Sequence, residues 1–232
     1  MTSGSLISVV IPTWNESDQI HRCLQQFEYL EGEWELIVAD GGSTDGTPEQ
    51  AEALGACVVR CTERGRGPQQ NAGAEVARGE LLLFLHADAI LPATAHGWIT
   101  STLSRPGVAA GAFRIRHAAE KWSGWKARTL RLADLRSHWT KIPYGDQGIF
   151  MKTATFRACG GFPRKPLMED VALVRKLSRM GGIETVRAEM RVSGRRFEHS
   201  PVRAFLCMNT FSLLDHLGVH PRTLARLYGN PR

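Results

Sequence analysis

Short apolar runs alternate with helix-like segments along the first half of the chain. Residues 6–11, LISVVI, are rich in β-branched side chains and are followed by Pro12, which predicts a buried strand. The predicted strands are residues 6–11, 34–40, 56–60 and 81–88. The predicted helices cover about residues 17–30 and 47–54, and the stretch from the RGRGP loop through Ala77. Ser17 or Asn15 is expected to cap the first helix. The alternation predicts an α/β fold whose parallel sheet is covered by helices on both faces.

The second half of the chain is less regular. Residues 108–115, VAAGAFRI, predict a strand. Helices are expected at residues 119–136, at residues 153–159, from Glu169 onward, and once or twice within residues 201–228.

Composition and charge narrow the class of protein. The chain has 232 residues, 43% hydrophobic and 22% charged, which is ordinary for a globular domain. The net charge is +6, yet the first 100 residues are acidic on balance and the rest are basic. The basic half indicates either an anionic partner or a basic solvated surface. With no CxxC pair, no signal-peptide pattern and no apolar run of about 18 residues, a cytoplasmic location is expected.

Polar segments follow three of the predicted strands where the strands end. They read PTWNES, DGGSTDG and HADAILP. Ligands of open parallel sheets bind beyond the carboxyl ends of the strands, so these segments are expected to form a site. The first segment lacks the glycines of a GxGxxG motif, which argues against a dinucleotide-binding dehydrogenase.

Charged side chains in and near these segments suggest how a ligand could be held. Asp40 directly follows a strand, and its carboxylate could accept from the imide N–H of uracil or another base edge, or could cap its own turn. Asp45, in STDGT, is expected to shape its turn. Arg64 and Arg66 flank a glycine ahead of a helix, a combination that suits phosphate.

Four acids and a histidine are candidates for metal binding or catalysis. Asp88 is expected to bind a divalent cation, which prefers oxygen ligands. His86 is expected on the same strand face, either near the ligand or hydrogen-bonded at the strand end. Glu169 and Asp170 open a helix, where an acid stabilises the helix dipole or, facing a cleft, acts as a general base. Asp146, in the irregular GDQG segment, is a further candidate.

Six segments, in this order, resemble family 2 glycosyltransferases with the GT-A fold. They are VVIPTWNES, IVADGGSTDGT, RGRGPQQNAG, FLHADAILP, GDQGIF and PLMEDVALVRKL, and they cover roughly residues 6–180. Within the family the chain looks most similar to the short bacterial branch described as radical-SAM/selenodomain-associated. The resemblance implies a single GT-A domain over residues 1–232. Its parts would be a nucleotide-sugar-binding half at about 1–115, an acceptor and catalytic half at about 116–200, and a helical tail at about 201–232.

The resemblance also implies a donor site. The residues implied to bind the nucleotide-sugar are Pro12, Trp14, Glu16, Asp40, Arg64, Asn71, Ala87 and Asp88. Glu16 would lie near the ribose or base, Asp40 would accept from the uracil N–H, and Asn71 would lie near the donor sugar. HAD takes the place of the family's DxD motif, so Asp88 would ligate the metal. His86 departs from that motif, which puts metal affinity and preference in doubt.

The catalytic residue implied by the resemblance is Asp170, as the base. The residues implied to support the site or to contact the acceptor are His86, Asp146, Gln147, Glu169, Arg195 and Arg196. Arg195 and Arg196 would fold over the diphosphate, or they are simply exposed. The implied reaction is hexosyl transfer from a nucleotide-diphospho-sugar, of the UDP type, to an acceptor hydroxyl, with inversion and with Mn²⁺ or Mg²⁺ as cofactor.

The partners other than the donor stay open. The basic half is compatible with a phosphorylated or lipid-linked acceptor and with peripheral contact to the inner face of the cell membrane. A helix at residues 202–217 would be interfacial, or would pack in the core or in a homodimer contact. No nucleic-acid partner is expected. The alternatives are a nucleotidyltransferase, whose glycine- and lysine-containing loop is missing after the first strand, and a non-catalytic module that binds anionic lipid or nucleic acid.

Overall fold

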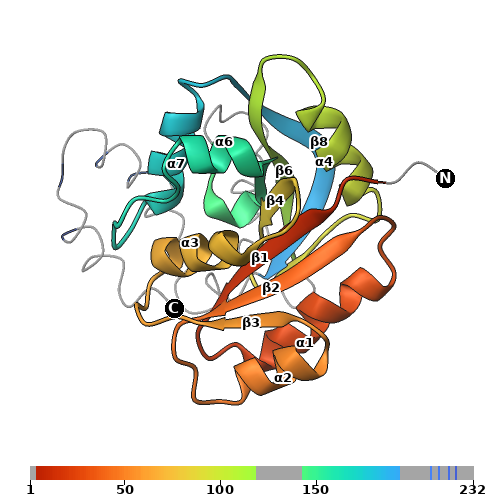
Figure 1. The fold of residues 1–232 in the computed structure, drawn as a ribbon, viewed down its shortest axis with the longest axis vertical. Helices are drawn as coiled ribbons and strands as arrows, with labels where there is room; N and C mark the ends of the chain where they lie inside the picture. Colours follow the sequence, from red (N-terminus) through yellow and green to blue (C-terminus); the bar gives the residue numbers. More distant parts are fainter. Residues whose placement is uncertain are drawn as a thin grey trace, which may run out of the picture.

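A computed structural model of the chain describes residues 4–118 and 143–193, with the single residues Thr210, Leu214, Val219 and Thr223. These residues form an α/β structure around one eight-stranded sheet, in the order β3-β2-β1-β4-β7-β6-β8-β5 (Figure 1). The helix predicted at residues 119–136 and nearly all of the predicted C-terminal tail lie outside the described residues, as do Arg195 and Arg196.

The strands and helices follow the predicted alternation closely in the first half. The strands are β1 (Ile7–Thr13), β2 (Trp34–Asp40), β3 (Cys57–Arg60), β4 (Leu81–Phe84), β5 (Ala89–Ile90), β6 (Val108–Ala118), β7 (Ile149–Lys152) and β8 (Gly182–Ser193). The α-helices are α1 (Ser17–Gln25), α2 (Thr47–Ala53), α3 (Arg66–Val76), α4 (Ala95–Leu103), α6 (Thr153–Ala158) and α7 (Glu169–Leu177). Two short 3₁₀ helices are η1 (Gln26–Glu28) and η2 (Gly145–Gln147). In the part of the chain described, no helix is long and apolar enough to cross a membrane.

Helices cover both faces of the sheet, as predicted. Alternate side chains of a strand point to opposite faces. Ile7, Val9 and Ile11 of β1 therefore enter one core, which we call the first core, together with residues of α1, α2 and α4. Val10 enters the second core, together with residues of α3, α6 and α7. Figure 1 shows α3, α6 and α7 on one side of the central strands and α1 and α2 on the other. Because β1 is buried on both faces, its apolar run is nearly continuous.

A glycine sets how closely α3 approaches the sheet. A Cβ on Gly73 would lie 2.4 Å from Val10 Cγ1, so only a residue without a side chain lets the helix lie this close to β1. The start of α3 is thereby held against the carboxyl ends of the strands, where the predicted site lies.

The sheet is parallel at β3-β2-β1-β4 and again at β6-β8, whereas β7 runs antiparallel to both β4 and β6. This arrangement is the mostly parallel sheet expected. The structure adds α4, β5, β7 and the twelve-residue β8, none of which was predicted. β8 pairs along the full length of β6, so its stability depends on a partner that is distant in the sequence.

Two predicted boundaries were wrong. β4 ends at Phe84 and not at residue 88, because its pairing with β1 and β7 stops there. The first helix has Glu16 as its N-cap, without a capping side-chain hydrogen bond, so neither Ser17 nor Asn15 is the cap. Its α-helical part ends at Gln25 and continues as η1.

Candidate active site

The loops that follow β1 and β2 are joined by hydrogen bonds. The Asn15 N–H donates to Ser43 Oγ (2.8 Å), and the Thr44 N–H donates to Asn15 Oδ1 (2.9 Å). Asn15 has φ of 52°, a left-handed conformation that asparagine tolerates better than most residues. The PTWNES and DGGSTDG segments therefore form one surface at the carboxyl ends of β1 and β2.

Asp45 shapes this surface, as predicted. Its Oδ1 accepts from the N–H and the hydroxyl of Thr47, and its Oδ2 accepts from the Ser17 N–H at the start of α1 (3.0 Å). Burial raises the pKa of Asp45, but the hydrogen bonds from Thr47 and Ser17 outweigh it and lower the pKa to about 2. Asp45 thus supplies from another loop the acceptor that the first turn of α1 needs.

Asp40 is buried at the end of β2, with 2% of its surface exposed. Its Oδ2 accepts from the N–H groups of Gly42 and Ser43 (2.9 Å each). Its Oδ1 accepts from the hydroxyls of Thr13 (3.1 Å) and Ser43. The carboxylate therefore caps its own turn, and contact with a base stays a prediction.

Gln69, which the sequence reasoning missed, connects three segments of the site. Its side chain is 4% exposed. Nε2 donates to the carbonyl oxygens of Thr13 and Ala39 (2.7 Å each), and Oε1 accepts from the Gly65 N–H (3.1 Å). The ends of β1 and β2 and the glycine loop are thus held together by one amide. No local pattern marks such a residue, because two of its three partners, Thr13 and Ala39, are distant in the sequence.

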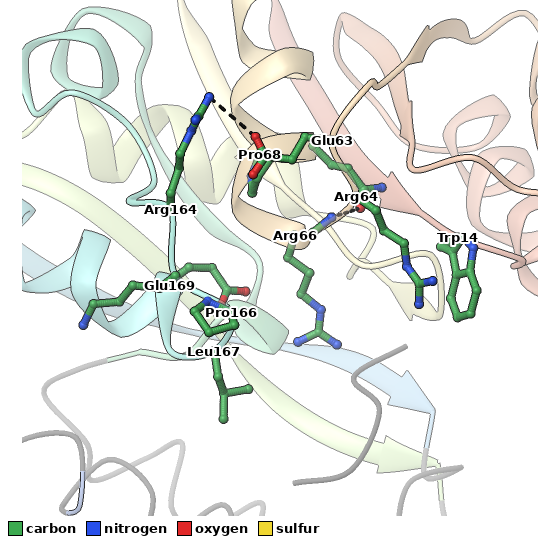
Figure 2. Close-up of a pocket in the computed structure, with 12 residues that line it drawn as sticks. Trp14, Glu63, Arg64, Arg66, Pro68, Arg164, Pro166, Leu167 and Glu169 are labelled. Carbon is green, nitrogen blue, oxygen red and sulfur yellow. Dashed lines mark hydrogen bonds and ion pairs between the residues drawn. The ribbon is translucent and has the colours of Figure 1, made fainter. Parts of the chain in front are cut away.

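A cavity of about 320 Å³ lies between the start of α3 and the segment before α7 (Figure 2). The cations that line it are Arg64, Arg66, Arg164 and Lys165, and the carboxylates are Glu63 and Glu169. Glu63 forms an ion pair with Arg164 (3.5 Å). The lining therefore carries an excess of positive charge, which suits an anionic ligand.

Arg64 and Trp14 form one wall of this cavity. The guanidinium carbon of Arg64 lies 3.2 Å from the centroid of the Trp14 ring, a stacked cation–π contact (Figure 2). The cavity thus brings together three residues of the predicted site, Trp14, Arg64 and Glu169, together with Arg66. Other members of the predicted set, Pro12, Asp40, Asn71 and Asp88 among them, do not line it.

Asp170 is held by backbone groups from two segments. Its Oδ2 accepts from the Gly145 N–H (2.6 Å), and its Oδ1 accepts from the Val171 N–H (2.7 Å). Burial raises the pKa of Asp170 and the charge of Asp146 adds to it, whereas the two N–H groups and Arg66 act in the opposite direction; the balance is a raised pKa. A fixed carboxylate with a raised pKa is suited to take up a proton.

Gln147 and Asp146 lie in η2, beside Asp170. The Gln147 side chain is buried, accepts from the Tyr144 N–H (2.9 Å) and donates to the Phe113 carbonyl (3.1 Å). It therefore holds the turn that presents the Gly145 N–H. Asp146 Oδ1 is buried and has no hydrogen-bond partner among the described residues.

Asn71 is engaged by the protein backbone. Its Nδ2 donates to the Phe162 carbonyl and its Oδ1 accepts from the Phe162 N–H, both at 2.9 Å. A Cβ on Gly161 would lie 2.6 Å from Asn71 Oδ1, so the glycine makes room for this pair. Asn71 fastens α3 to the GGFP turn, and contact with a donor sugar stays a prediction.

The HAD segment forms a turn. The Ala89 N–H donates to the His86 carbonyl (3.1 Å), which closes the turn after β4. The expectation that His86 and Asp88 share a strand face was therefore wrong, because strand alternation does not continue through a turn. The Ala87 side chain is buried in the first core, so only its backbone can meet a ligand.

Asp88 is a partly exposed carboxylate in this turn. The Cys23 Sγ lies 3.8 Å from the His86 carbonyl oxygen, which places α1 beside this turn. Burial raises the pKa of the Cys23 thiol, and the charges of Asp88 and Glu16 raise it further. Among the described residues, no group of three or more His, Cys, Asp or Glu side chains is placed to hold a metal ion. Mg²⁺ often uses only one or two carboxylates, with water and substrate phosphates completing its shell. Asp88 therefore fits a metal shared with a diphosphate and not a site built from protein ligands alone.

The described residues thus form an open α/β sheet with fixed carboxylates near its strand ends and a cation-lined cavity, an arrangement that suits an anionic ligand. The sequence model of glycosyl transferase family 2 matches residues 8–163. The chain belongs to this family, as the resemblance implied; the more specific bacterial branch stays a prediction.

Relatives and solved structures agree with this assignment. Glycosyltransferase AglE of Haloferax volcanii is 32% identical over 91 residues, which cover 35% of this chain and 30% of the relative. The undecaprenyl-phosphate 4-deoxy-4-formamido-L-arabinose transferase of Pseudomonas paraeruginosa is 28% identical over 158 residues, 63% of this chain and 46% of the relative. The chain thus spans less than half the length of these curated relatives.

Two solved structures show the same fold. The mannosyltransferase PcManGT of Pyrobaculum calidifontis, in complex with GDP-Man and Mn²⁺, has a TM-score of 0.72 at 22% identity, covering 96% of this chain and 67% of its own. Glucosyl-3-phosphoglycerate synthase of Mycobacterium tuberculosis, in complex with Mn²⁺, UDP and glucosyl-3-phosphoglycerate, has a TM-score of 0.63 at 22% identity, covering 93% and 81%. The GT-A fold predicted from the sequence is confirmed.

Proposed function

We propose that the protein is an inverting glycosyltransferase that moves a sugar from a nucleotide-diphospho-sugar, of the UDP type, to an acceptor hydroxyl. The observation that carries the proposal is the Asp170 carboxylate, fixed by two backbone N–H groups and raised in pKa, under the influence of the Arg66 charge. Family membership and the fold shared with Mn²⁺-containing transferase complexes support sugar transfer.

The donor would lie along the carboxyl ends of the strands. Trp14 and Arg64 would form the wall for its base and ribose, and Asp40 would accept from the uracil N–H. Arg66 lies between this wall and Glu169 in the cavity (Figure 2), where its guanidinium would face the diphosphate and offset its charge. These contacts would fix the donor so that its anomeric carbon faces Asp170.

Asp88 would hold the divalent metal, Mn²⁺ or Mg²⁺, together with the donor phosphates. A bound metal of this kind supplies positive charge that stabilises the diphosphate leaving group. Glu16, the N-cap of α1, would lie near the ribose.

Asp170 would act as the general base. As the acceptor oxygen bonds to the anomeric carbon, its proton passes to Asp170, and the bond from that carbon to the diphosphate oxygen breaks. One displacement from the opposite face inverts the configuration. General base catalysis contributes about 10²–10⁴-fold in rate. A raised pKa makes Asp170 a stronger base than an ordinary aspartate, although it must be ionised to act.

The excess of cations in the cavity also favours an acceptor that carries phosphate, either free or lipid-linked. Donor and acceptor phosphates would then share the basic lining, with Arg164 and Lys165 nearer the segment before α7.

A nucleotide-sugar screen tests the proposal. UDP- and GDP-sugars, each with Mn²⁺, Mg²⁺ or EDTA, should be compared by thermal shift and by release of nucleoside diphosphate. A UDP-sugar should stabilise the wild-type protein only when a divalent metal is present. In Asp88→Ala, adding the metal should no longer increase the stabilisation by the UDP-sugar. Asp170→Asn should keep donor binding and lose transfer by about 10²–10⁴-fold, whereas Asp18→Asn, an exposed aspartate on α1, should match the wild type. No stabilisation by any nucleotide-sugar would refute the proposed function.

A further inference from the structure

A small apolar cluster, separate from the two main cores, lies under the start of α7. Its buried members are Leu167, Met168 and Val171. Its partly buried members are Tyr144 and two residues from the C-terminal part of the chain, Leu214 and Val219. We call these six residues the third cluster.

The third cluster adjoins both groups that hold Asp170. One donor is the N–H of Val171, which is itself a member, and the other is the N–H of Gly145, which follows Tyr144 in the chain. Val171 is in the first turn of α7, where an N–H has no acceptor within the helix. Its bond to Asp170 is therefore part of what fixes the helix start. Movement of this cluster would shift the Gly145 N–H relative to the carboxylate, because the carboxylate moves with its chain neighbour Val171.

Met168 shows that packing determines the backbone at this point. It is the N-cap of α7, with φ of 63° and ψ of 27°, a left-handed conformation that is unfavourable for a residue with a Cβ. Its side chain is buried in the third cluster, and its carbonyl accepts the first helical bond, from the Ala172 N–H (3.1 Å). Such a backbone persists only where the surroundings hold it, and here the surroundings are the third cluster.

Leu214 and Val219 contribute to the third cluster from far along the chain. The Val219 N–H donates to the Leu214 carbonyl (2.9 Å), so the two residues are joined by a backbone hydrogen bond. The buried members lie within five consecutive residues, and a segment this short cannot enclose its own side chains. Apolar contacts from another part of the chain are needed to cover them.

We infer that Leu214 and Val219 are positioning residues for Asp170: by completing the third cluster they hold the start of α7 and η2 in the geometry that the transfer step needs. The inference rests on the proposed function, in which Asp170 is the base. It assigns to Leu214 and Val219 an effect on the rate of the chemical step that is exerted through Asp170.

The test compares equal truncations at two apolar positions. Leu214→Ala should lower kcat by about tenfold or more, because small displacements of a reacting group cost roughly this much, with the donor KM changed by less than about twofold. Leu214→Met, which keeps the volume, should restore kcat. Leu30→Ala is the matched control, since Leu30 is also a partly buried leucine but packs against the first core. Val219→Ala and Val58→Ala form a second pair of the same kind.

Amide hydrogen exchange gives a measure that does not depend on activity. Protection of the Gly145 and Val171 amides should fall in Leu214→Ala and stay unchanged in Leu30→Ala. Equal kcat in these two variants, with an active wild type, would overturn the positioning role. If the wild type transferred no sugar, but the Gly145 and Val171 amides lost protection in Leu214→Ala and not in Leu30→Ala, the proposed function would be refuted. The structural link between Leu214 and the groups that hold Asp170 would remain.

Discussion

Replacing Gln69 by leucine should loosen the site and destabilise the fold together. The substitution keeps a buried side chain of similar size but removes the amide that joins β1, β2 and the glycine loop. Each lost bond to the Thr13 and Ala39 carbonyls costs about 1 kcal/mol net, and the Gly65 N–H, left without this acceptor, costs about 1–2 kcal/mol. The expected loss is about 3–4 kcal/mol. For a chain of this size that corresponds to a fall in Tm of roughly 6–16 °C.

Chemical denaturation of Gln69→Leu measures this loss directly. The matched control is Gln70→Leu, the same substitution at the next residue. Gln70 is equally buried, and its side chain makes no hydrogen bond to the residues that the structure describes. Gln70→Leu should change stability by less than about 1 kcal/mol. Because Gly65 precedes Arg66 at the cavity wall, Gln69→Leu should also weaken nucleotide-sugar binding. If both variants lost the same free energy of unfolding, the bridging role of Gln69 would be wrong.

Three further predictions follow from packing and charge. Gly73→Ala should destabilise the fold by about 1–3 kcal/mol, since its Cβ would lie 2.4 Å from a β1 valine. Gly97→Ala, with open space around it, should instead stabilise the fold by up to about 1 kcal/mol, and thermal unfolding measures both changes. The lowered pKa of Asp45 stabilises the fold above its ordinary pKa. Asp45→Asn should therefore be about 1 kcal/mol less stable than wild type at pH 6, after allowance for the exposure of Asp45, and the difference should disappear as the pH falls below about 2. Removal of the Arg66 charge should raise the pKa of Asp170, so Arg66→Ala should move the acidic limb of kcat to higher pH while Arg66→Lys does not.

The first half of the fold could be predicted because β1 and β4 are buried on both faces, which gives nearly continuous apolar runs, and because α1 buries apolar residues at helical spacing. The second half could not. β8 carries charges at several positions, and its twelve residues are held as a strand by long-range pairing with β6, which no local pattern reports. The end of β4 was placed too late for a related reason, because the apolar run continues through Leu85 whereas the sheet pairing stops at Phe84.

The site was predictable in position but less so in its contacts. Residues at strand ends could be identified because all parallel strands end at one edge. Which side chain serves a ligand and which serves the protein depends on partners distant in the sequence. Asn71 pairs with the Phe162 backbone, and Gln147 bonds to the backbones of Tyr144 and Phe113. Both side-chain amides are therefore already hydrogen-bonded within the protein.

The hydrogen bonds that Asp40 already accepts within the protein limit how it could recognise a base. A carboxylate has about four acceptor positions, and Thr13, Gly42 and Ser43 together supply four donors. The two backbone N–H groups are fixed by the turn, whereas the hydroxyls of Thr13 and Ser43 can rotate away. A uracil N–H could therefore bond to Oδ1 only by displacing a hydroxyl, and the net gain would be the difference between two hydrogen bonds. Contact with Asp40 would then contribute little to affinity but could still select a base, because a base that presents an acceptor there would face a buried carboxylate.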